Sequence, residues 1–89
     1  MVFTSDLIKE ADFICEVKLD GPEQVKEFNS LCCKTDGQFD VISGRHNVDG
    51  KSILGIFSLS LSRPVTVAAT FVDEREKEKF ISGVQKFKS

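Results

Sequence analysis

Residues 51–59 read KSILGIFSL, nine residues with a single charge and five large apolar side chains. Ser52 is a residue type that often caps a helix, and apolar residues follow it over little more than two turns. We therefore expect a short, very apolar helix after Ser52 that runs through Leu61 and is stopped by Arg63-Pro64. Such a helix cannot bury every side in a small domain, so part of it is expected to face outward.

Upstream of this helix the chain predicts a strand followed by a longer helix. Apolar and polar residues alternate from Phe13 to Leu19, which indicates a strand that is buried on one face. Residues 20–22, Asp-Gly-Pro, end that strand and favour the start of a helix. Apolar residues then recur at helical spacing, which predicts an amphipathic helix over residues 22–34.

The remaining segments complete a mixed pattern of helices and strands. Residues 39–42 predict a second strand, and a turn at residues 43–47 leads to a short third strand near Val48. Residues 64–72 alternate again, and Asp73 opens a last amphipathic helix. The order is β-α-β-β-α-β-α, which we interpret as an α+β open-faced sandwich with a four-stranded antiparallel sheet and helices on one face.

Length and composition set the class of protein. The 89 residues suit a single domain, in which residues 1–11 form an extra N-terminal segment of unassigned role. The net charge of −2 predicts no direct attraction to nucleic acid or to a membrane surface. We expect a cytoplasmic protein, because the sequence lacks a signal peptide pattern and a membrane-length apolar run. The three cysteines are expected to be reduced, with one of the adjacent pair Cys32 and Cys33 in the core.

Few residues in this chain could build an active site. There is one histidine, and neither clustered carboxylates nor a glycine-rich phosphate loop accompanies it. That histidine, His46, falls in a polar turn and is interpreted as a solvated surface residue. We therefore predict no enzymatic activity, no cofactor and no metal site, and an enzyme on an unrelated α+β fold is the weakest hypothesis.

The stretch at residues 49–59, which contains Lys-Ser-Ile at residues 51–53, resembles the HPr family, the histidine-containing phosphocarriers of the bacterial phosphotransferase system. In that family a Lys-Ser-Ile-hydrophobic-Gly stretch begins the second helix. The following strand, PVTVAATF, and the acidic start of the last helix, DERE, fit the same pattern. The resemblance covers residues 48–87 well, and before that it depends on the order of the elements.

The resemblance also implies where the carrier histidine should lie. The family has a His-x-Arg-Pro motif before its first helix, and the matching residues here are Leu19, Asp20, Gly21 and Pro22. Only the proline is kept. Leucine cannot accept a phosphoryl group and Asp20 would repel one, so this position is degenerate and we predict no phosphocarrier activity.

In Gram-positive HPr proteins the serine that matches Ser52 is phosphorylated by HPr kinase, and the product binds a transcription regulator. A subgroup, the catabolite-repression HPr proteins, lacks the carrier histidine and keeps the serine. This chain resembles that subgroup in these two features, though not closely in sequence. The resemblance implies regulatory phosphorylation at Ser52 and partner docking through Lys51, Ile53, Leu54 and Phe57. The alternative is an interaction or scaffold module on the same fold, in which Ser52 only caps the helix.

Overall fold

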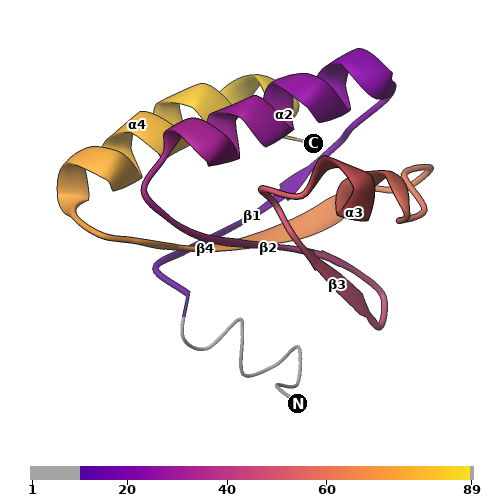
Figure 1. Cartoon of the computed structure of the whole chain (residues 1–89), viewed down its shortest axis with the longest axis horizontal. Coiled ribbons are helices and arrows are strands. Elements are labelled where there is room, and N and C mark those ends of the chain that lie inside the picture. The colour runs from indigo at the N-terminus through magenta and orange to yellow at the C-terminus, as the bar shows by residue number, and fades with distance from the viewer. Residues whose placement is uncertain (1–10, 89) are drawn as a thin grey trace.

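The computed structural model describes residues 11–88 and contains one four-stranded sheet (Figure 1). Its strands are β1 (Phe13–Val17), β2 (Gly37–Ser43), β3 (His46–Asp49) and β4 (Val65–Phe71). They lie in the order β1-β4-β2-β3, and every neighbouring pair is antiparallel. The expected N-terminal segment at residues 1–11 falls outside the described residues except for Ala11.

The helices are α2 (Pro22–Lys34), α3 (Ile53–Phe57) and α4 (Glu74–Val84), which continues into the 3-10 turn η1 (Gln85–Phe87). All of them lie on one face of the sheet, with α2 and α4 side by side and α3 above β3 (Figure 1). The predicted element order and the open-faced α+β architecture are therefore confirmed. In the part of the chain that the structure describes, no helix is long and apolar enough to cross a membrane.

The core fills the space between the sheet and the two long helices. Cys15, Val67, Val41 and Val48 form one row across all four strands on the side that faces the helices. Phe80 of α4 is fully buried between the helices and the sheet. Its ring packs within 4.7–6.4 Å, centroid to centroid, of the rings of four other phenylalanines: Phe13, Phe28, Phe39 and Phe71.

The boundaries of α2 match the prediction because local signals agree at both ends. Pro22 occupies the first turn, where its missing N–H is not needed. At the other end the buried Thr35 donates its hydroxyl to the Leu31 carbonyl at 2.8 Å, which satisfies one of the last free carbonyls.

The apolar helix is shorter than expected. The prediction extended it to Leu61, but α3 ends at Phe57, and the Ser58 and Leu59 amides close it with tight turns back to Gly55 and Ile56. Leu59 is nevertheless buried, since the irregular segment after α3 turns it into the core. The first strand is also shorter and stops at Val17, although Leu19 beyond it still faces the core.

Candidate functional site

The junction between β1 and α2 is the position where the resemblance places a phosphocarrier histidine. Leu19 is only 2% exposed and belongs to the hydrophobic core, so its side chain does not face solvent. Gly21 is the N-cap of α2 and offers no side-chain acceptor to the first turn. At this junction a buried leucine therefore stands at the position of the histidine, and a glycine stands at the position of the arginine.

Polar contacts around the β1–α2 junction fix the path of the backbone between the strand and the helix. Gln24 accepts a hydrogen bond from the Asp20 amide at 2.6 Å, which fixes the entry into α2. Lys18 donates to the Ser62 carbonyl at 2.9 Å, and its ammonium lies 4.0 Å from the Asp20 carboxylate. These contacts tie the junction to the segment before β4. Asp20 adds a negative charge beside the position at which the resemblance implies a carrier histidine.

The start of α3 is built differently. The Ser52 hydroxyl caps the helix by accepting a hydrogen bond from the Gly55 amide at 3.2 Å, and the residue is exposed. The chain reaches it through the buried Gly50, where a Cβ would lie 2.9 Å from the Phe39 Cβ, so a side chain there would force β2 and the loop apart. The amide of Gly50 donates to the Phe39 carbonyl at 2.8 Å and thereby anchors the loop before Ser52.

Lys51, the residue before Ser52, is exposed, and its ammonium packs over the ring of Phe39. It lies 5.7 Å from the centroid of the Phe39 ring, in a cation–π arrangement. The same side chain lines a small hollow with Asp40 and Asp49, which are opposite each other on β2 and β3. Burial, and then the charge of Asp49, raise the pKa of Asp40. The Lys51 ammonium therefore lies over the Phe39 ring, and its side chain shares this hollow with the two carboxylates.

Part of α3 faces outward, as predicted. Leu54 is 80% exposed and Phe57 is 41% exposed, and we call these two residues the α3 patch. Ile53, which was expected to belong to the same surface, is half-buried and packs against the core. Ile56 is fully buried and is the residue that anchors the helix. The exposed apolar surface of α3 is therefore narrower than the sequence predicted.

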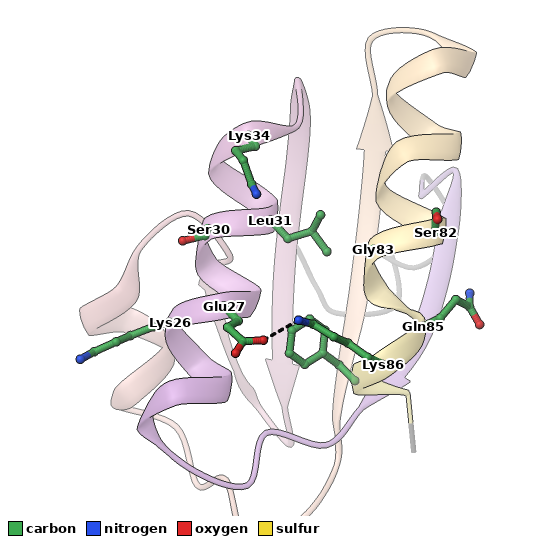
Figure 2. A pocket seen from close by; sticks show the side chains of 10 residues that line it. Lys26, Glu27, Ser30, Leu31, Lys34, Ser82, Gly83, Gln85 and Lys86 are labelled. Carbon is green, nitrogen blue, oxygen red and sulfur yellow. Dashed lines mark hydrogen bonds and ion pairs between the residues drawn. The ribbon is translucent and has the colours of Figure 1, made fainter.

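A groove of about 620 Å³ runs between α2 and α4 (Figure 2). Its floor contains Leu31 and Gly83, and a Cβ on Gly83 would lie 2.7 Å from a methyl carbon of Leu31, so the two helices cross closely there. Lys86 on one wall forms an ion pair with Glu27 on the other. Sequence reasoning missed this groove because its walls come from segments far apart in the chain. It contains neither the β1–α2 junction nor Ser52.

The cysteines divide as predicted. Cys32 is buried and Cys33 is exposed, and both are free thiols, as is the buried Cys15. Burial raises the pKa of Cys32, and the charges of Cys33 and Asp49 act in the same direction. A thiol with a raised pKa is a poor nucleophile, so Cys32 is a core residue and not a reactive centre.

Comparison with known proteins supports the architecture. No protein-family model matches the chain, and no curated protein sequence matches it. The crystal structure of HPr-C-His from Thermoanaerobacter tengcongensis is similar to it, with a TM-score of 0.64 and 28% sequence identity. The match covers 83% of this chain and 89% of that one. The four-stranded sheet with its helices on one face is therefore an HPr-like fold.

Proposed function

We propose that this protein is a divergent HPr-family member of the bacterial phosphotransferase system that regulates partners and does not carry phosphoryl groups. The contrast between the two helix starts is the observation that carries this proposal. Leu19 is buried in the core at the carrier position, whereas Ser52 is exposed at the start of α3. One position has lost its acceptor, and the other presents a hydroxyl to solvent.

The proposed switch is phosphorylation of Ser52 by HPr kinase with ATP. The Ser52 oxygen forms a bond to the γ-phosphorus, the bond from that phosphorus to the bridging oxygen breaks, and ADP leaves while the hydroxyl proton goes to a base of the kinase. The added charge lies at the start of a helix, where anions are stabilised by free amides and the helix dipole. Lys51, the adjacent residue in the chain, is the cation that would turn toward the phosphate.

The partner surface in this proposal is the α3 patch next to Ser52. Leu54 at 80% exposure is an apolar side chain that a folded monomer leaves almost entirely in water. A partner of the transcription-regulator type would cover Leu54 and Phe57 and read the charge on Ser52. This function belongs in the cytoplasm, where the three thiols stay reduced.

One observation favours the second candidate, a docking module without phosphorylation. The Ser52 hydroxyl already has a structural task as the cap of α3, through its 3.2 Å contact with the Gly55 amide. If that is its whole role, the α3 patch still supplies a docking surface, and the partner would bind the unmodified chain.

Intact mass after incubation with HPr kinase and ATP separates the candidates. We expect one added phosphate on the wild type and on Ser60→Ala, a matched loss of an exposed serine hydroxyl, and none on Ser52→Ala. Incubation with enzyme I and phosphoenolpyruvate is expected to add nothing. No phosphate from the kinase would leave the unmodified docking module as the function. A phosphate from enzyme I would show that the chain has a carrier site and would overturn the proposal.

A further inference from the structure

A second hollow, of about 790 Å³, lies between the β2–β3 hairpin and the segment that leads into β4. Two of the chain's three arginines and its only histidine line it, namely Arg45, His46 and Arg63. Ser43, Ser60 and Ser62 also line it, and no Asp or Glu is among the described residues of the lining. We propose that this hollow binds a small molecule that carries a phosphomonoester group and a hydroxylated body.

The charge of the hollow is opposite to that of the whole chain. The net charge is −2, yet two arginines line the hollow and no acidic residue is in the described lining. Within residues 11–88, none of the salt bridges uses Arg45 or Arg63, so their guanidinium groups are available to a ligand. Glu16 is opposite Thr66 in the sheet register and is not part of the lining. Guanidinium groups match the geometry of phosphate oxygens, which is why this pattern indicates an oxyanion.

One wall of the hollow is held by a tight turn. Ser43 and His46 are the last paired residues of the β2–β3 hairpin, and only Gly44 and Arg45 separate them. Gly44 has a φ of 62°, while no other residue type in the described chain has a positive φ. Glycine in this conformation at the first position of a two-residue loop is the pattern of a type II′ turn. The turn therefore sets the direction in which Arg45 leaves the backbone.

The opposite wall is held by one contact from Lys18, the residue after β1, and by one contact between two serines of the lining. Lys18 donates to the Ser62 carbonyl at 2.9 Å, and the hydroxyl oxygens of Ser60 and Ser62 lie 3.2 Å apart. Pro64 follows Arg63 and restricts its backbone to extended conformations. Both arginines thus project from constrained backbone, one from a two-residue turn and the other from the residue before a proline.

The size and the hydroxyls define the rest of the ligand. Sites for small organic ligands typically have volumes of about 300–1,000 Å³, and a bare phosphate would leave most of this hollow empty. The hydroxyls of Ser43, Ser60 and Ser62 are both donors and acceptors, so they suit a polyol body beside the phosphate. The hollow does not contain Ser52, so ligand binding there is independent of the proposed phosphorylation.

The test is an amide chemical-shift titration of the ¹⁵N-labelled full chain with glycerol 3-phosphate, with chloride used to keep the ionic strength constant. We expect saturable shifts that concentrate at residues 43–46 and 60–63, and at least fivefold weaker binding of inorganic phosphate at the same amides. Ser52→Ala is expected to bind as the wild type does, which separates this result from the fate of the proposed function.

Charge-matched variants make the test specific. Arg45→Gln with Arg63→Gln is expected to weaken glycerol 3-phosphate binding at least tenfold, whereas Arg75→Gln on α4 should change it less than twofold. Both arginines of the hollow are exposed, so the melting temperature of the double variant should equal that of the wild type. The single variant Arg63→Gln can be compared with Arg75→Gln in the same way. Shifts that rise linearly without saturation, an equal loss in Arg75→Gln, or inorganic phosphate binding as tightly as glycerol 3-phosphate would each overturn the proposal.

Discussion

The start of α2 has no side-chain cap, whereas the start of α3 is capped by a serine hydroxyl, and this difference separates a structural helix from a candidate functional one. At α2 the cap is a glycine, Leu19 before it is buried, and three residues of the helix lie in the core. At α3 the cap is the exposed Ser52, and Ile56 is the only buried residue of a five-residue helix. The long helix α2 is held by packing, and its N-cap offers no side-chain hydroxyl. The short helix contributes little to the core and leaves a hydroxyl and two apolar side chains exposed.

The largest expected effect is on the free energy of unfolding, and it compares a Phe→Ala substitution in α2 with the same substitution in α3. Phe28→Ala in α2 should lower the free energy of unfolding by about 3–5 kcal/mol, because the ring is fully buried against Phe80 and Phe87. Phe57→Ala in α3 should cost at most about 1 kcal/mol, because the ring is 41% exposed. Urea denaturation of both variants measures the difference. Equal losses would mean that α3 is as much a part of the core as α2.

The next prediction places a histidine at Leu19, the position that the resemblance assigns to the carrier residue. Leu19→His should destabilise the domain by about 2–4 kcal/mol, since it removes a core leucine and places an imidazole among apolar side chains. The variant should also gain no phosphate from enzyme I and phosphoenolpyruvate, as judged by intact mass. A stable variant that accepts phosphate would show that Leu19 turns outward readily and that burial does not close the junction.

The smallest effect compares the two caps directly. Ser52→Ala should lower the free energy of unfolding by about 1 kcal/mol, because the Gly55 amide loses its acceptor. Gly21→Asp should raise it by a few tenths of a kcal/mol, since an N-cap carboxylate supplies the acceptor that glycine lacks, and a Cβ at Gly21 meets nothing within 4 Å. Thermal melts detect both shifts. A lower free energy of unfolding for Gly21→Asp would show that repulsion from Asp20 exceeds the gain from capping.

Local pattern was sufficient for most of the fold. Alternation predicted β1 and β4, although it extended β1 to Leu19, and the proline and the spacing of apolar residues predicted the bounds of α2 correctly. The same reasoning extended α3 too far, because the apolar run continues to Leu61 while the helix stops at Phe57. A run of apolar residues does not distinguish a helix from an irregular segment, and it does not show which of its members are buried: Leu59 lies in the core, whereas Leu54 is exposed.

The sequence by itself determined the order of the elements, the absence of a histidine from the β1–α2 junction, and a serine at the start of α3, since each depends on residues close together in the chain. Only the tertiary structure decided that Ile53 packs inward while Leu54 remains exposed, and that Lys51 lies over Phe39. It also brought Arg45 and Arg63 to one hollow. Those outcomes depend on how the sheet places distant segments beside one another, and no local pattern carries that information.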